Sequence, residues 1–267
     1  MLTCPSFNLV RALHNQILYE HPLNEQCRTL LRLSHLFEQF DYHLSKDSLQ
    51  NSRSALASLL DIVAILARAD LKSELIKTLE KQNKNLAAMT SKKGVDQGRL
   101  EQILRETSYL SQTLKSNNCQ LGQSLRVNEF LKTISQRISI PGGSFDFDLP
   151  QFHYWLHLPH EERVLQLNAW RQKVQVVQST VDLLLTLIRN SNHPKHVVAG
   201  EGIYQQSLDS QRSVQLIQVM MPEDAMVYAV ISGNKHRFCV RVMESGDWEH
   251  PSQTSMDIPF SLKICFI

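Results

Sequence analysis

The spacing of apolar residues changes once along this chain of 267 residues, at His193-Pro194. Before that point apolar residues recur every three or four positions, as on one face of an α-helix, and after it they alternate, as on a half-buried strand. Helices that precede strands in this way are typical of an α+β fold with a mainly antiparallel sheet. We therefore predict a multi-helix domain over residues 21–192, and a β domain made of residues 193–267 together with residues 13–20.

Polar capping residues predict where the helices begin. A side-chain oxygen at the N-cap accepts a hydrogen bond from a backbone N–H of the first turn, so Asn, Asp and Ser are favoured there. A short aromatic helix is expected over residues 150–156, and a short strand or extended corner over residues 144–148. The predicted N-caps are Asn24, Ser52 or Ser54, Asp70 and Asp96, and the apolar face of the first helix comprises Leu30, Leu33, Phe37, Phe40 and Leu44.

No helix-breaking residue lies between Pro159 and Asn190, so the sequence predicts one long helix near residues 159–190. Its apolar residues keep a three-four spacing for three heptads. They are Leu167, Trp170, Val174, Val177, Val181, Leu184 and Ile188. Such a seam needs a partner helix, either in the core of the same chain or in a second copy across a homodimer interface.

The strand expected over residues 237–243 has one apolar and one cationic face. Phe238, Val240 and Val242 fall on one side, because side chains alternate along a strand. At a rise of about 3.3 Å per residue, Arg237 and Arg241 stand about 13 Å apart on the other side. Lys235 precedes them, and the pattern is equally typical of a solvated outer face. The remaining strands are expected over residues 17–20, 197–206, 214–221, 226–232 and 261–267.

Charge and cysteine content limit the possible functions. The formal net charge is only +2, so any cationic site must be local. Five scattered cysteines, without Cys-x-x-Cys spacing, indicate free thiols in a reducing compartment. Neither a signal peptide nor an apolar run of eighteen residues is recognised, so we expect a cytosolic protein without a membrane span.

The sequence contains only weak signals of a catalytic or metal-binding site. His153, His157 and His160 have helical spacing, but Pro159 interrupts the register before the third. Gly142-Gly143-Ser144 matches neither the phosphate-loop fingerprint nor the dinucleotide-binding fingerprint. The Asp146/Asp148 pair lacks any supporting catalytic group. We therefore expect no enzyme activity, no metal and no cofactor.

Four sequence motifs resemble the ZapD (YacF-type) family of bacterial cell-division proteins. The similarity runs in one order from about residue 16 to the C-terminus, whereas residues 1–12 have no recognised counterpart. The motifs are Glu20-His21-Pro22-Leu23-Asn24-Glu25 with Arg28 and Arg32, Gln136-Arg137-Ile138-Ser139-Ile140-Pro141-Gly142-Gly143, Trp155-Leu156-His157-Leu158-Pro159, and Ile231-Ser232-Gly233 through Lys235, Arg237 and Arg241.

The resemblance implies a cytoplasmic homodimer with a helical and a β domain, recruited to the division ring at mid-cell. Members of this family bind the C-terminal tail of the GTPase FtsZ in a basic groove between the domains, bundle its protofilaments and lower its GTP turnover. The tail combines acidic and apolar residues. By motif position, the residues implied in tail binding are Arg28, Arg32, Arg137, His157, Lys235, Arg237 and Arg241.

A nucleic-acid-binding protein that uses the same cationic face is the alternative function. The near-neutral net charge, the lack of a recognised nucleic-acid-binding module and the lack of aromatic residues beside the arginines disfavour it. Binding to generic DNA at physiological salt would distinguish the two.

Overall fold

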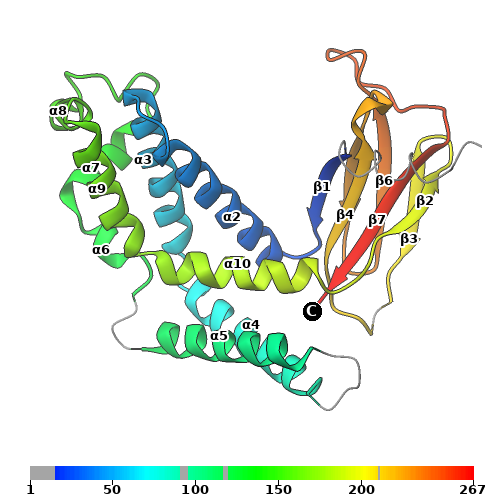
Figure 1. Ribbon diagram of the computed structural model, residues 1–267. Helices are drawn as coiled ribbons and strands as arrows, with labels where there is room; N and C mark the ends of the chain where they lie inside the picture. Colours follow the sequence, from blue (N-terminus) through cyan, green and yellow to red (C-terminus); the bar gives the residue numbers. More distant parts are fainter. Residues whose placement is uncertain (1–15, 91–95, 117–119, 210) are drawn as a thin grey trace, which may run out of the picture. The chain divides into compact units, whose positions relative to one another are not determined.

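The computed structural model describes residues 16–90, 96–116, 120–209 and 211–267, which fold as two compact units (Figure 1). The helical unit is Thr29–Leu184, and the β unit combines the chain up to Arg28 with Leu185–Ile267. The boundary falls inside two helices, so the domain limits predicted from sequence remain a prediction. Residues 1–12, which have no recognised counterpart in the family, and residues 13–15, which we predicted to belong to the β domain, lie outside the described residues.

Helices precede strands along the chain, apart from one N-terminal strand, which confirms the predicted α+β class. In the described parts of the chain, no helix is long and apolar enough to cross a membrane. The helices are α2 (Glu25–Leu44), α3 (Leu49–Leu66), α4 (Leu71–Ala87), α5 (Gln97–Lys115), α6 (Gln123–Arg126), α7 (Glu129–Ile138), α8 (Pro150–Leu156), α9 (His160–Gln172) and α10 (Gln175–Arg189).

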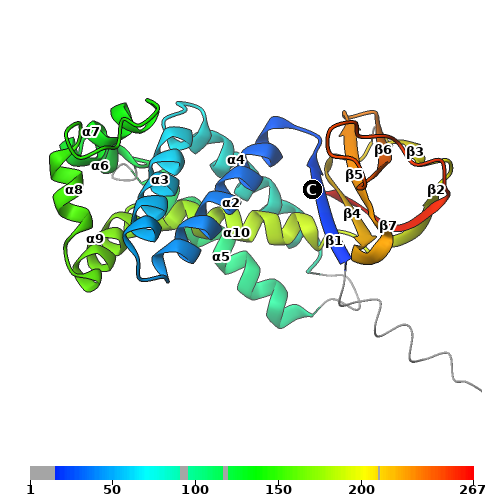
Figure 2. The same cartoon turned by 90° about the horizontal axis from the view of Figure 1, so that it is seen from above.

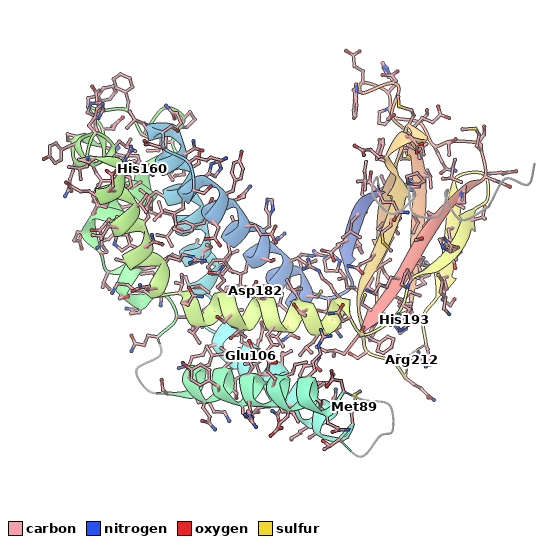
Figure 3. The ribbon with its side chains drawn as sticks, viewed as in Figure 1. Met89, Glu106, His160, Asp182, His193 and Arg212 are labelled. Carbon is pink, nitrogen blue, oxygen red and sulfur yellow. The ribbon has the colours of Figure 1, made fainter. Side chains whose placement is uncertain are left out.

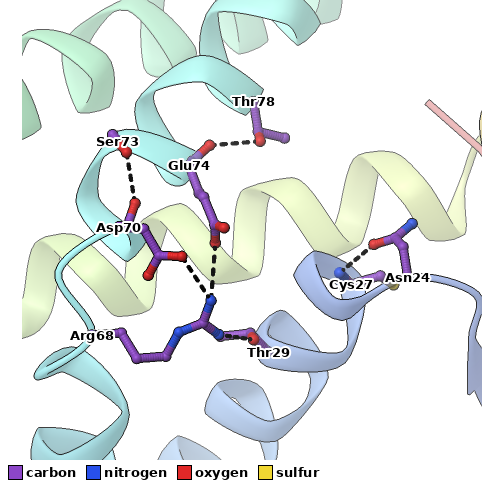
Figure 4. Close-up of polar contacts among 8 residues, drawn as sticks. All are labelled: Asn24, Cys27, Thr29, Arg68, Asp70, Ser73, Glu74 and Thr78. Carbon is purple, nitrogen blue, oxygen red and sulfur yellow. Dashed lines mark hydrogen bonds and ion pairs between the residues drawn. The ribbon is translucent and has the colours of Figure 1, made fainter.

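Two predicted N-caps are confirmed. The Asn24 side chain accepts a hydrogen bond of 2.8 Å from the backbone N–H of Cys27 (Figure 4), and that of Asp96 accepts one of 3.0 Å from Arg99. The predicted start of α3 was wrong: Ser48, with extended backbone, caps this helix through the N–H of Asn51. The cap therefore lies four residues before the earlier of the two predicted serines.

Asp70 occupies the N-cap position of α4, as predicted, but its side chain does not cap the helix. Its carboxylate lies 3.2 Å from the Arg68 guanidinium and makes no cap hydrogen bond (Figure 4). Arg68 also lies 3.7 Å from Glu74 and donates to the Thr29 hydroxyl at 3.1 Å. A nearby guanidinium therefore competes successfully with the helix terminus for this carboxylate.

The single long helix predicted near residues 159–190 is wrong, because the chain bends at Lys173 and Val174, between α9 and α10 (Figure 1). The N–H of Lys173 bonds to the Trp170 carbonyl, three residues back, which closes the last turn of α9 tightly. Trp170 stacks on Phe130, with ring centroids 5.8 Å apart. No Pro or Gly causes the bend, so we attribute it to packing of α9 against α7 and α8.

The apolar seam of α9 and α10 is buried within one chain. All seven residues of this seam are at most 5% exposed. This supports the intramolecular alternative and leaves the seam unavailable as a homodimer interface.

Residues 144–148 form turns, which excludes the predicted strand in this segment. The N–H of Asp148 donates to the Phe145 carbonyl, and the N–H of Phe147 donates to the Asp146 carboxylate. These local hydrogen bonds replace a strand ladder. Phe145 and Phe147 are 60% and 77% exposed, so their alternation does not reflect a buried face.

Two antiparallel sheets form the β unit, with strand orders β1-β4-β7-β2 and β3-β6-β5. The two sheets lie face to face (Figure 2), and buried apolar residues from both form the core between them. The strands are β1 (Gln16–Pro22), β2 (Lys195–Ala199), β3 (Ile203–Ser207), β4 (Val214–Pro222), β5 (Val227–Gly233), β6 (Arg237–Glu244) and β7 (Ile258–Phe266).

The strand predicted over residues 197–206 is in fact two strands in different sheets. Glu201 and Gly202 adopt positive φ angles of 48° and 73°, which turn the chain between β2 and β3. A side chain at Gly202 would collide with the Thr254 carbonyl, so glycine is needed there. Packing of this corner against Thr254 therefore divides a segment whose sequence pattern predicted one continuous strand.

Candidate functional site

Strand β6 carries the cationic residues predicted from its alternation. Phe238, Val240 and Val242 are at most 2% exposed and lie in the core between the sheets, whereas Arg237 and Arg241 are exposed on the other side. Lys235 is exposed in the turn before β6. We call Lys235, Arg237 and Arg241 the cationic stripe.

An open groove of about 520 Å³ lies along part of the cationic stripe. Its lining is mainly polar and comes from all three strands of the sheet β3-β6-β5. The lining residues are Gln205, Gln206, Ser207, Ser232, Gly233, Asn234, Arg237, Phe238 and Cys239. Gln205, Ser207 and Ser232 were missed from sequence, because their place beside β6 depends on strand pairing that no local pattern reveals.

No carboxylate of the described residues forms an ion pair with the cationic stripe. Two other predicted cations do have partners, since Arg28 lies 3.7 Å from Glu25 and Arg137 lies 3.9 Å from Asp148. These pairs are long and partly exposed, so each stabilises the fold by less than about 1 kcal/mol. The charges of the stripe are therefore available to an external anion.

The turn before β6 is held by an Asn side chain and by the N-terminal segment. The Asn234 carboxamide oxygen accepts hydrogen bonds from the backbone N–H groups of His236 and Arg237, at 2.9 and 3.2 Å. A Cβ at Gly233 would lie 2.9 Å from both Leu23 Cδ2 and Phe238 Cβ, so this close approach favours glycine. Leu23 in turn donates its N–H to the Gln215 carbonyl. Two of the sequence motifs thus meet at the base of the stripe.

Arg28 and Arg32 lie one turn apart on the same side of α2. The first turn of this helix is fixed to β4, because the Asn24 amide donates to the Gln215 side chain at 2.7 Å. Burial, and then the charge of Arg28, lower the pKa of His21. His21 is accordingly neutral near pH 7 and adds no charge to this region.

Arg137 lies in the last turn of α7. A chain reversal that requires glycine follows and ends this helix. Gly142 has a φ of 74°, and a Cβ at Gly143 would lie 2.5 Å from the Arg137 carbonyl. The guanidinium of Arg53 donates to the Ser144 hydroxyl at 2.7 Å and secures the turn from the other side. The glycines therefore have a structural role, as expected from the lack of a phosphate-binding fingerprint.

His157 lies at the end of α8, and its Nδ1–H donates to the His153 carbonyl at 2.8 Å. The rings of His153 and His157 are 4.5 Å apart, whereas His160 instead lies 3.2 Å from Asp47. Figure 3 shows His160 at the start of α9. Among the described residues, no group of three or more His, Cys, Asp or Glu side chains could hold a metal ion.

The seven predicted binding residues fall in both compact units. Lys235, Arg237 and Arg241 come together on one strand and its turn, whereas the proximity of the other four to them remains a prediction. Arg28 and the cationic stripe belong to the β unit, and Arg32, Arg137 and His157 belong to the helical unit.

Thiol reactivity provides a test of how deeply the structure buries each cysteine. Burial raises the pKa of Cys27 to about 12 and that of Cys265 to about 11. Relative to the usual thiol value, Cys27 should carry about a thousandfold less thiolate at neutral pH. We expect iodoacetamide to label the groove residue Cys239 in the native protein, and Cys27 and Cys265 only after unfolding. Peptide mass mapping reads out each site, and rapid native labelling of Cys27 would contradict the structure.

Comparison with known proteins identifies similar chains. The family model for ZapD, described as a cell division protein, matches residues 31–241. A cell division protein ZapD from Methylococcus capsulatus is 38% identical over 253 residues, which cover 95% of this chain and 99% of that protein. One from Ralstonia pickettii is also 38% identical, over 93% of this chain and 99% of its own length.

Proposed function

The chain belongs to the ZapD family of cell-division proteins, and we propose that it binds the C-terminal tail of FtsZ and crosslinks FtsZ protofilaments. In this proposal the protein acts in the cytoplasm, at the mid-cell division ring, where it bundles filaments, promotes ring assembly and lowers GTP turnover. It binds through basic residues and needs no cofactor. The observation that carries the proposal is the cationic stripe, whose charges have no carboxylate partner among the described residues.

An acidic tail fits the stripe chemically. Arginine donates two parallel hydrogen bonds to a carboxylate, and each charge-assisted contact contributes roughly 1.5–3 kcal/mol before desolvation. A few contacts of this kind give a Kd in the micromolar range, which corresponds to about −8 kcal/mol. The polar lining of the groove adds hydrogen-bonding groups beside Arg237.

Crosslinking requires two sites on one particle, so we propose that the protein acts as a homodimer. Filaments display many tails, and the second site of a dimer therefore binds at a high effective concentration. This avidity allows modest affinity per tail to hold filaments together. Light scattering at micromolar concentration tests the dimer, because a species of only 30.7 kDa would contradict it.

Titration with a synthetic FtsZ tail peptide at two ionic strengths tests the binding step. We expect micromolar binding at about 50 mM salt, and clearly weaker binding at about 300 mM, because partly exposed ion pairs are screened. Absence of binding at low salt would refute the proposal. Tight binding of generic duplex DNA at physiological salt would instead favour the nucleic-acid function.

A further inference from the structure

On the outer face of the sheet β3-β6-β5, the surroundings of Arg237 and those of Arg241 differ in chemistry. Strand register places Ile203 of β3 and Val230 of β5 directly on either side of Arg241. Opposite residues of antiparallel strands share a face, with Cβ atoms about 5 Å apart. The next pair on this face is Tyr228 and Met243. Arg241 is therefore surrounded by apolar side chains, whereas Arg237 borders the polar groove.

These apolar residues lie outside the core. Ile203 is 40% exposed, although the adjacent Tyr204 packs against Phe238 and Phe260 between the sheets. Val230 is half-buried, whereas Val240, on the core side of β6, is fully buried. We name Ile203, Tyr228, Val230 and Met243 the apolar shelf. It adjoins a cation that lacks a carboxylate partner in the described residues.

We propose that the apolar shelf binds an apolar side chain of the same peptide whose carboxylates contact Arg237 and Arg241. The ligand class is therefore an extended acidic peptide with an apolar residue next to an acidic one. This inference rests on the proposed function and adds the specificity determinant of that site. Charge complementarity supplies the anion, and burial of the shelf supplies a contribution that salt does not screen.

Two consequences distinguish this arrangement from purely ionic recognition. An acidic peptide without apolar residues loses nearly all of its binding at high salt. A peptide with both residue types retains measurable binding there, because only the ionic part of the interaction is screened.

The test compares Ile203→Thr and Val230→Thr with Val198→Thr in the full-length protein. Threonine keeps the β-branched shape and favours strands, so the sheet should remain intact, which a thermal melt checks. We expect each shelf substitution to weaken binding of the FtsZ tail peptide about five- to tenfold, from the loss of buried apolar area. The dependence of Kd on salt should keep its slope. Val198 is 53% exposed on β2 of the other sheet, and its substitution should change nothing.

A second peptide, in which the apolar tail residues are replaced by Ser, completes a double-mutant cycle. It should bind the wild type as weakly as the original peptide binds the shelf variants, and lose little more on those variants. If the original peptide binds wild type and both shelf variants equally, the shelf proposal is overturned while tail binding stands. If the wild type does not bind the tail at all, the proposed function fails as well.

Discussion

Simultaneous replacement of Arg237 and Arg241 by Glu should abolish co-sedimentation with FtsZ filaments and weaken tail-peptide binding more than about a hundredfold. Two charge-assisted contacts of roughly 1.5–3 kcal/mol each are lost, and repulsion of the acidic tail is added. The fold should persist, because both side chains are exposed and the core residues of β6 are unchanged. Circular dichroism before and after heating checks this.

A matched control separates local recognition from net charge. The double substitution Lys77→Glu/Arg99→Glu reverses two exposed cations on α4 and α5, and, like the first variant, changes the formal net charge from +2 to −2. This control should bundle filaments normally. If both variants lose bundling equally, the effect is one of overall charge, and normal bundling by the β6 variant would remove the stripe from the site.

The face of β6 was predictable because a strand has a fixed alternation. Once the residues from Arg237 onward are extended, Phe238, Val240 and Val242 must share a side, whatever strands lie beside them. The environment of that face was not predictable. Ile203 and Val230 reach Arg241 only through the strand order β3-β6-β5, which depends on contacts between distant parts of the sequence.

The two differences in the helical region have different physical causes. The bend after Trp170 arises where aromatic packing between distant residues outweighs local helix preference. The missing cap hydrogen bond of Asp70 is a local effect, because Arg68, two residues earlier, holds its carboxylate. By contrast, Asn24 caps α2 as predicted, because its side chain serves the helix and Gln215 at once.

Glu20 illustrates a residue whose role in its motif is structural. Its carboxylate accepts two hydrogen bonds from the Arg189 guanidinium, at 3.0 and 2.7 Å, and a third from the Gln218 amide at 2.7 Å. The Glu20 side chain is 16% exposed and that of Arg189 is 35% exposed. The network joins β1, β4 and the end of α10, all within the β unit. It therefore ties the N-terminal strand to elements nearly two hundred residues away in sequence.

We expect Glu20→Ala to lower the free energy of unfolding by about 3 kcal/mol, because it removes the bidentate carboxylate from a half-buried arginine. Urea denaturation followed by circular dichroism measures the change. The exposed pair Glu101–Arg105 on α5 is the control, and Glu101→Ala should cost less than about 0.5 kcal/mol. Glu20→Met/Arg189→Met should recover much of the loss, since an apolar pair of similar volume leaves no charge unmatched. Equal stability of Glu20→Ala and the wild type would show that the Glu20–Arg189 pair does not stabilise the fold.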